Sequence, residues 1–228
     1  MADKISRDRK KELEQLDPFQ ENLLKVMAFI KEFKKQLILI GGAVVLVALI
    51  FSGIMYSFQK AENKADVLVT EALEKYAKAN DPEKGYLETE AGFKTIFTEY
   101  ANTNAGKLAK IQFAKICYEA SKFDQSYQYY TEALQVFEND ELIKNFILAS
   151  LGHVCIARKE FDEAKAYFLK IEKGKTELLK DEARFSLAML DEASGNMVES
   201  KKMYEKIMTE HGNSMYTTIA KGKVQEMN

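Results

Sequence analysis

The sequence predicts an all-α protein in which a single N-terminal transmembrane helix is followed by an α-solenoid of stacked helix pairs. The first observation is a run of 22 residues, Leu37–Phe58, that contains no charged side chain. The second is that no proline follows Pro82, while Ala, Leu, Lys and Glu dominate, a composition typical of helical arrays. The third is an apolar pattern that recurs every 36–38 residues, about the length of one helix pair.

The apolar run is long enough to cross a bilayer. At about 1.5 Å per residue it reaches roughly 33 Å, the thickness of a hydrocarbon core crossed with slight tilt. A helix pairs every backbone amide within the segment, which lipid requires. The alternative is a buried helix of a soluble domain, but such apolar runs are usually about 10–14 residues long. We therefore assign residues 36–59 to a transmembrane helix.

The residues around the span predict its processing and its orientation. The preceding arm is longer than the charged start of a signal peptide, and Ser57–Ala61 has no small-x-small cleavage site, so we expect an uncleaved anchor that crosses once. The arm, residues 1–35, holds nine Lys and Arg against seven acidic residues, a net charge of +2. Positive flanks stay in the cytoplasm. We expect a cytoplasmic arm and an exported domain, residues 60–228.

The arm contains a juxtamembrane amphipathic helix. Asp17 and Pro18 form a typical N-cap followed by proline at the first helical position, whereas the charged residues 1–16 predict no regular structure. One helical face then carries apolar residues at Phe19, Leu23, Val26, Met27, Ile30 and Phe33. Two interpretations stay open: an interfacial helix that lies on an anionic leaflet or packs on a partner in the membrane, or simply the entry of the transmembrane helix.

The exported domain repeats itself. Residues 93–110 align with residues 204–221 at an offset of 111, and intermediate copies occur at steps of 38 and 36 residues. In the first helix of each copy, a large apolar residue is directly followed by a small one, which we call the large-small step. In the second helix, a small residue is followed four positions later by an aromatic residue. The clearest large-small steps are Leu151-Gly152 and Leu187-Ala188. The small residues are Ser126 and Ala164, and the aromatic rings are Tyr130, Phe168 and Tyr204.

This period and pattern resemble tetratricopeptide repeats, in which stacked helix pairs share one continuous core. The departures are the absent Trp, the absent proline at the repeat end and a period of 36–38 instead of about 34 residues. The resemblance implies three repeats over residues 107–211. A degenerate pair precedes them at 62–101, with Asp81 and Pro82 expected to cap and start its second helix, and a capping helix follows at 214–227.

The sequence offers no catalytic or metal-binding motif. His153 and His211 have no ligand-type residue one helical turn away, and no third metal-type residue joins them. Nucleotide-binding loops and hydrolase motifs are absent, and a net charge of −2 leaves no nucleic-acid footprint. We expect no enzyme activity, no cofactor, no metal site and no small-molecule substrate.

The two cysteines occupy the same position in successive repeats. Cys117 and Cys155 are 38 residues apart, so their helices are expected to be neighbours. Packed helices place equivalent backbones about 9–10 Å apart, beyond the roughly 7 Å that a disulfide spans. We therefore expect two buried thiols.

What remains is a surface for binding. By the tetratricopeptide resemblance, the first helices of the repeats line a concave groove, here mostly apolar and suited to extended or unfolded polypeptides of varied sequence. The alternative is that the first pair or the C-terminal helix covers several of these positions. The expected groove residues are Ile111, Lys115, Tyr118, Ala149, His153, Ile156, Phe185, Met189 and Glu192.

Over residues 25–228 the layout resembles the YfgM-like ancillary subunit of the bacterial Sec translocon. The shared features are the short arm, the single anchor and repeats in the style of Ile96-x-Thr-Glu-Tyr100 and Phe161-Asp162-Glu163-Ala164. The resemblance implies a single-pass protein of the bacterial inner membrane with a periplasmic domain. Its partners would be translocon subunits, exported polypeptides and periplasmic chaperones, in a chaperone-like role in protein transport. The alternative is a membrane-tethered scaffold for envelope assembly or cell division with one defined protein partner.

Overall fold

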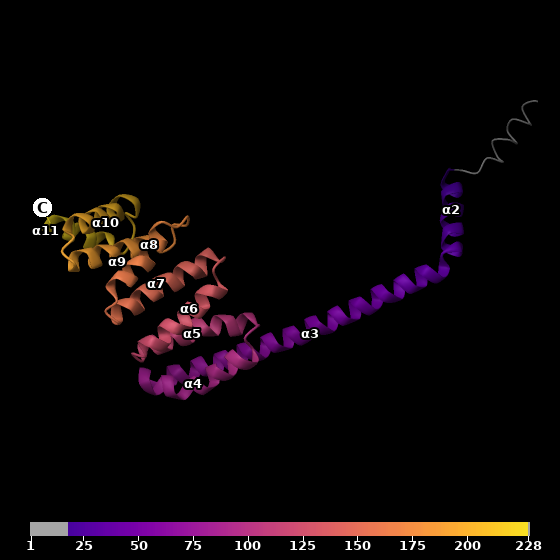
Figure 1. Cartoon of the computed structure of the whole chain (residues 1–228), viewed down its shortest axis with the longest axis horizontal. Coiled ribbons are helices and arrows are strands. Elements are labelled where there is room, and N and C mark those ends of the chain that lie inside the picture. Colours follow the sequence, from indigo (N-terminus) through magenta and orange to yellow (C-terminus); the bar gives the residue numbers. More distant parts are fainter. Residues whose placement is uncertain (1–17, 228) are drawn as a thin grey trace, which may run out of the picture. The chain divides into compact units, whose positions relative to one another are not determined.

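The computed structural model describes residues 18–227, and these residues are almost entirely helical (Figure 1). The charged segment 1–16 and the Asp17 cap lie outside the described residues. The chain divides into two compact units, Met1–Phe58 and Gln59–Asn228. The helices are α2 (Pro18–Glu32), α3 (Lys34–Ala79), α4 (Pro82–Glu99), α5 (Asn104–Glu119), α6 (Phe123–Val136), α7 (Glu141–Ala157), α8 (Phe161–Glu172), α9 (Lys180–Ala193), α10 (Met197–Glu210) and α11 (Thr217–Glu226).

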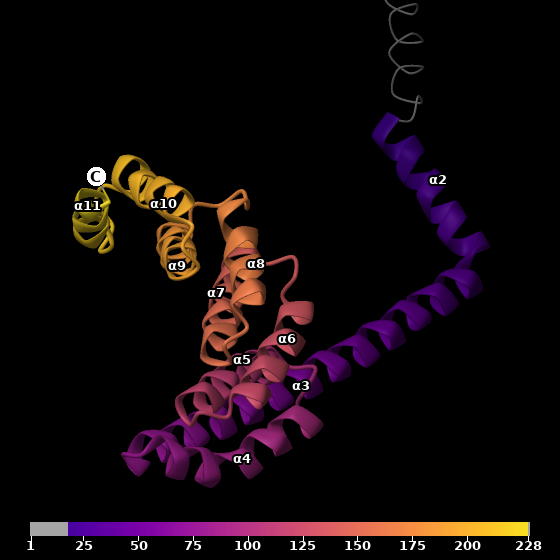
Figure 2. The ribbon, with the colours of Figure 1, turned by 60° about the vertical axis from the view of Figure 1, so that its left-hand side comes forward.

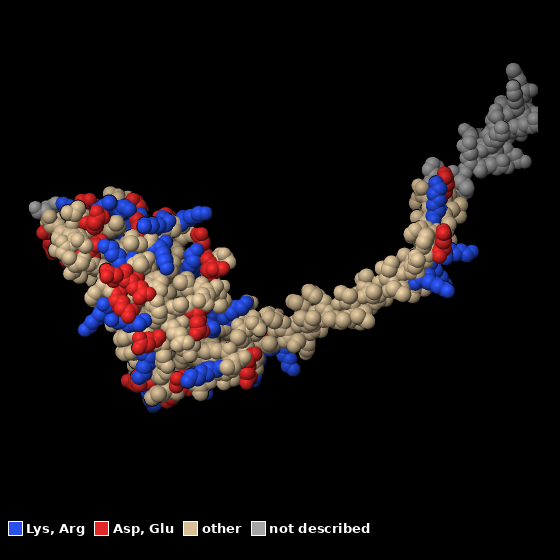
Figure 3. All heavy atoms as spheres, viewed as in Figure 1, with Lys and Arg blue, Asp and Glu red and all other residues tan. Residues whose placement is uncertain are grey.

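The first unit contains α2 and the beginning of α3. The helix is interrupted at Phe33, between the end of α2 and the start of α3. By length and composition, α3 is able to cross a membrane, and the 18-residue window that meets this test is entirely unburied. Figure 3 shows this part of α3 without charged atoms. The expected apolar span is therefore present as one continuous helix.

The helix that holds the span continues without interruption into the repeat domain. Its last part, beyond Phe58, belongs to the second unit and buries Ala65 and Ala72. α3 ends before Asn80, which adopts a left-handed backbone conformation. The Asp81 carboxylate then accepts a hydrogen bond from the Lys84 amide at 2.8 Å, which caps α4 as the sequence predicted. The end of α3 and helix α4 share one apolar cluster that includes Ala72 and Phe93, so they form the first pair of the domain.

Three helix pairs follow: α5 with α6, α7 with α8, and α9 with α10. Each pair turns at a residue of positive φ, namely Ser121, Lys159 or Gly195. These three turns are 38 and 36 residues apart, which confirms the period expected from the sequence. The amide after each turn residue closes the same helix-ending bond, from Lys122 to Cys117 O, from Glu160 to Cys155 O and from Asn196 to Asp191 O.

From α4 onward, each helix packs against the next along the chain, as expected of a solenoid (Figure 2). The expected small residues Ser126 and Ala164 are fully buried, as is Ser200 at the equivalent position of α10. The aromatic rings four residues later are buried with them, at Tyr130, Phe168 and Tyr204. The small residues and aromatic rings that the sequence predicts to pack between the helices are therefore part of the buried core.

Candidate functional site

Two adjacent hollows lie along the first helices of the repeats. One, of about 340 Å³, is formed by residues of α5, α6 and α7. The other, of about 440 Å³, is formed by α7, α8 and α9 together with Tyr216, which precedes α11. His153 lines both hollows, so together they make one feature, which we call the groove. The first hollow is lined by Lys115, Tyr118, Tyr130, Phe146, Ser150 and His153. The second is lined by His153, Ile156, Phe161, Glu182, Phe185, Ser186, Met189, Leu190, Ala193 and Tyr216.

Helical spacing brings these side chains together. On α7, residues Phe146, Ser150 and His153 follow one another at steps of four and three, which places them on one helical face. On α9, Glu182, Ser186 and Met189 have the same spacing. Because α7 and α9 are first helices of successive repeats, their equivalent faces border the same groove.

Large apolar side chains in the groove are open to solvent. Phe146, Phe161 and Met189 are 47%, 53% and 52% exposed. They come from α7, α8 and α9, so apolar surface continues along the groove. Single exposed apolar residues are ordinary on protein surfaces, whereas apolar residues gathered in a hollow are typical of a binding site.

His153 connects the two hollows. Its Nε2 atom lies 2.8 Å from Glu182 Oε1, so a hydrogen bond joins α7 to α9. The imidazole also meets the ring of Phe168 edge-on, with the centroids 5.3 Å apart. These two contacts fix the ring and leave a polar pair within an otherwise apolar lining.

The C-terminal end of the groove is an aromatic wall. Phe185 stacks on Tyr216 with ring centroids 4.6 Å apart and an interplanar angle of 21°. Burial, together with the nearby carboxylates of Glu182 and Asp181, raises the pKa of Tyr216 above its ordinary value. At the other end, burial raises the pKa of Tyr130 to about 12 although Ser150 opposes the shift. Both phenols therefore stay neutral at physiological pH.

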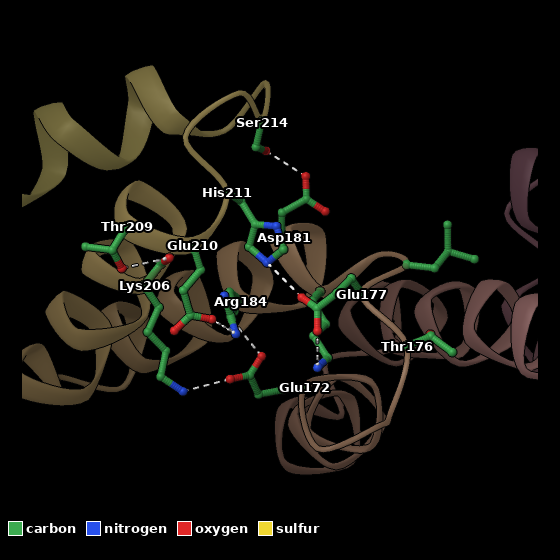
Figure 4. A network of polar contacts seen from close by, with 12 residues as sticks. Glu172, Thr176, Glu177, Asp181, Arg184, Lys206, Thr209, Glu210, His211 and Ser214 are labelled. Atoms are coloured by element: carbon green, nitrogen blue, oxygen red, sulfur yellow. Dashed lines mark hydrogen bonds and ion pairs between the residues drawn. The ribbon is translucent and has the colours of Figure 1, made fainter.

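A buried polar network anchors α9, the helix that carries one side of the groove (Figure 4). Arg184 is only 4% exposed, and its guanidinium contacts Glu172 Oε2 at 2.7 Å and Glu210 Oε2 at 2.6 Å. Lys206 Nζ contacts the other Glu172 oxygen at 2.8 Å. The paired charges of Arg184 and Glu172, which are largely buried, and of Lys206 and Glu210, which are partly exposed, link α8, α9 and α10.

Six of the nine groove residues expected from the sequence line the groove: Lys115, Tyr118, His153, Ile156, Phe185 and Met189. Three do not. Ile111 and Ala149 are buried in the core. The Glu192 carboxylate instead accepts hydrogen bonds from Lys223 at 2.7 Å and from the Tyr204 hydroxyl at 3.2 Å. On α7 and α9 the lining begins at Phe146 and Glu182, one helical turn earlier than the register expected from tetratricopeptide repeats.

Sequence reasoning missed several lining residues. Phe146 and Glu182 lie at helical spacing before His153 and Met189, so a search one turn further toward each N-terminus would have found them. Phe161 comes from a second helix, and Tyr216 from the segment before α11. The repeat pattern of the first helices does not predict Phe161 or Tyr216 as lining residues. Their positions depend on how the helix pairs stack.

One group of metal-ligand type occurs in the described part of the chain, formed by Cys155, Glu160 and Glu163. Burial raises the pKa of the Cys155 thiol to about 12, and the two nearby carboxylates add to the shift. Glu163 accepts a hydrogen bond from the Tyr127 hydroxyl at 2.5 Å. Glu160 is held by the Arg158 guanidinium at 3.0 Å. Glu163 and one oxygen of Glu160 therefore have partners within the protein, whereas the buried Glu160 Oε2 has none among the described residues. Neither histidine belongs to the group.

The two thiols are buried and free, as the repeat spacing predicted. Burial raises the pKa of Cys117 to about 12 as well, with a further contribution from Glu90. Thiols of this kind are poor nucleophiles at neutral pH, because the reactive form is the thiolate. Neither lines the groove.

Comparison with known protein families matches residues 28–228 to the tetratricopeptide repeat-like domain. Comparison with curated proteins gave no match. The matched range includes the apolar part of α3, the helix pairs and α11. Domains of this kind serve protein–protein interaction, and the exposed groove fits protein partners in general. The chain belongs to the tetratricopeptide repeat-like domain family.

Proposed function

We propose that this chain is a membrane-anchored interaction protein whose groove binds extended polypeptide segments, with a chaperone-like role beside the Sec translocon. The observation that carries the proposal is the groove itself: two joined hollows on three successive first helices, with Phe146, Phe161 and Met189 exposed in it. A compact ligand would fill one hollow. An extended chain places successive side chains in both.

The chemistry of the lining favours partners of varied sequence. The second hollow is built from aliphatic and aromatic side chains, and Met189 supplies a flexible thioether that adapts to different shapes. Surfaces of this kind re-pack around several partners, whereas sites with many fixed polar groups select one. Exported polypeptides that have not yet folded present such apolar segments.

The proposed location is the bacterial inner membrane. The exposed apolar part of α3 supports a single membrane span, and the positive arm supports a cytoplasmic N-terminus with the repeat domain in the periplasm. The resemblance to the YfgM-like translocon subunit supplies the partners: translocon subunits, exported chains and periplasmic chaperones. Because α3 runs from the span into the first helix pair, the groove would be tethered to the membrane where exported chains emerge.

A second function is favoured by the polar pair in the groove. His153 and Glu182 form a fixed hydrogen-bonded unit between the hollows. A fixed polar pair within an apolar site gives orientation and specificity to one ligand. This observation favours a membrane-tethered scaffold for envelope assembly or cell division that holds one defined protein partner.

Co-purification in mild detergent tests the proposal. The full chain is compared with Met189→Glu, which places a charge in the groove, and with Val198→Glu as a matched control. Val198 is 80% exposed on α10 and lines neither hollow. We expect the unaltered chain and the control to retain translocon subunits and many exported polypeptides, and Met189→Glu to lose the polypeptides.

The other outcomes separate the alternatives. A single partner that is retained by the control and lost by Met189→Glu would support the scaffold. Absence of translocon subunits from every preparation would contradict the association with the translocon. Equal retention of polypeptides by Met189→Glu and the unaltered chain would contradict binding in the groove.

A further inference from the structure

Helix α2 presents an apolar face that no described residue of the protein covers. Leu23, Val26, Met27 and Ile30 are each at least half exposed. Their spacing of three, one and three residues places them on one side of the helix. Soluble proteins rarely leave such a continuous apolar face in water. The face therefore requires a partner.

The opposite side of α2 is polar or small. Since each residue of an α-helix advances by about 100°, Ala28 lies on the side away from Ile30. Glu21 and Lys25 share that side and form an exposed ion pair at 2.8 Å. A helix with one apolar and one charged side is suited to a boundary between water and hydrocarbon.

The neighbouring sequence identifies the partner as a lipid surface. α2 is separated from α3 by the single residue Phe33, and the apolar run begins at Leu37. If this run enters the bilayer, α2 lies within a few residues of the headgroups. The apolar face then meets lipid without any further protein.

The charges at this end of α2 specify the kind of lipid. Lys31, Lys34 and Lys35 cluster where the span begins, and none forms an ion pair with a described residue. Clusters of lysine next to a membrane span are attracted to anionic headgroups. Uncompensated lysines here favour an anionic surface over a neutral one.

The break at Phe33 allows α2 to leave the axis of the span. Phe33 ends one helical segment and begins the next: its amide donates to Phe29 O, and its carbonyl accepts from the Leu37 amide, both at 2.9 Å. A change of direction at this residue therefore leaves these backbone groups paired, which lipid surroundings demand. We propose that α2 is an amphipathic anchor that lies in the interface of an anionic membrane, its Leu23–Ile30 face toward the hydrocarbon. This inference rests on the membrane anchor of the proposed function.

Tryptophan fluorescence provides the test, because the chain contains no tryptophan. Three variants of the full chain, Ile30→Trp, Ala28→Trp and Leu46→Trp, are reconstituted into phosphatidylcholine vesicles with and without phosphatidylglycerol. Quencher groups are placed either near the headgroups or deep in the acyl chains. All three positions are exposed in the protein, so the substitutions leave the repeat core intact.

We expect the shallow quencher to reduce emission of Ile30→Trp several-fold more than that of Ala28→Trp, and phosphatidylglycerol to widen this difference. Leu46→Trp reports the anchor separately through the deep quencher. If Leu46→Trp is quenched but the two α2 variants respond equally, α2 is only an extension of the span and the inference is wrong. If Leu46→Trp is quenched and neither α2 variant responds, α2 faces water or protein, which also overturns it. If Leu46→Trp is not quenched, the anchor itself is wrong, and the inference falls with it.

Discussion

A Cβ atom added to Gly152 would lie 2.5 Å from Cζ of Phe168. Because Gly152 on α7 has no side chain, the aromatic ring of Phe168 on α8 can pack directly against the α7 backbone. Phe168 is fully buried, so its ring has no free volume into which to move. The small residue of the Leu151-Gly152 step therefore allows the two helices of this repeat to pack closely.

Substituting Gly152 by alanine is therefore expected to destabilise the domain. Overpacking of a tight core costs about 1–3 kcal/mol, because either the ring or the helix axis must shift. The matched control is Gly92→Ala on α4, where a Cβ meets nothing within 4 Å. Since alanine is the better helix former, the control should gain roughly 0.5–1 kcal/mol. Urea unfolding followed by circular dichroism measures both, and an unchanged midpoint for Gly152→Ala would contradict the packing account.

The turn within each repeat gives a second prediction. Lys159 ends α7 with φ of 63°, a conformation that costs a side-chain-bearing residue about 1 kcal/mol and glycine much less. Gly195 occupies the equivalent turn of the next repeat. Lys159→Gly should therefore raise stability by up to about 1 kcal/mol.

Lys173→Gly is the control for this turn, because Lys173 follows α8 with φ of −83°. There glycine only adds freedom to the unfolded chain, and we expect a loss of about 0.5–1 kcal/mol. Thermal unfolding distinguishes the two substitutions by sign. A loss of stability in both would show that the Lys159 side chain matters more than its backbone conformation.

The acid sensitivity of the domain should depend on Glu172. Burial opposes its ionisation, but hydrogen bonds from Arg184 and Lys206 outweigh this and hold its pKa below the ordinary value. A lowered pKa in the folded state adds stability at pH values above the unfolded-state pKa of about 4.3. That contribution is lost as the pH falls through the folded-state pKa.

Glu172→Gln removes the titrating group, so stability should decrease less steeply between neutral pH and pH values below about 4.3. Glu205→Gln, an exposed site on α10, should retain the steep profile of the unaltered chain. Urea unfolding at a series of pH values makes the comparison. Parallel profiles for the two variants would exclude Glu172 as a source of the acid dependence.

Neither native thiol should react in the folded protein. Burial raises the pKa of Cys117 and of Cys155 to about 12, so almost no thiolate forms at pH 8. A thiol reagent should modify both rapidly only after unfolding in denaturant. Val198→Cys places a third thiol at an exposed position and should react at once. Rapid modification of the native thiols without denaturant would indicate that the repeats open locally.

The sequence predicted much of the fold because repeats impose local rules. The 36–38-residue period, the Asp81 cap and the buried rings of Phe168 and Tyr204 all follow from spacing along one chain. The continuity of α3 was open from the sequence, because nothing at the end of the apolar run marks either a break or a continuation.

The groove was predicted less completely, for a physical reason. Which face of a first helix stays open depends on the rotation of each pair against the next. On α7, Phe146 is exposed whereas Ala149, three residues later, is buried. The wall formed by Tyr216 depends on where the segment before α11 returns to the repeats, which the repeat pattern does not encode.

Photo-crosslinking in intact cells tests the central claim most directly. A crosslinking side chain at Met189 is compared with one at Val198, and an accessibility tag follows Asn228. The account predicts a tag outside the cytoplasm, with crosslinks from Met189 to many newly exported chains and few from Val198. Equal crosslinking at the two positions would contradict polypeptide binding in the groove, and a cytoplasmic tag would contradict the orientation of the anchor.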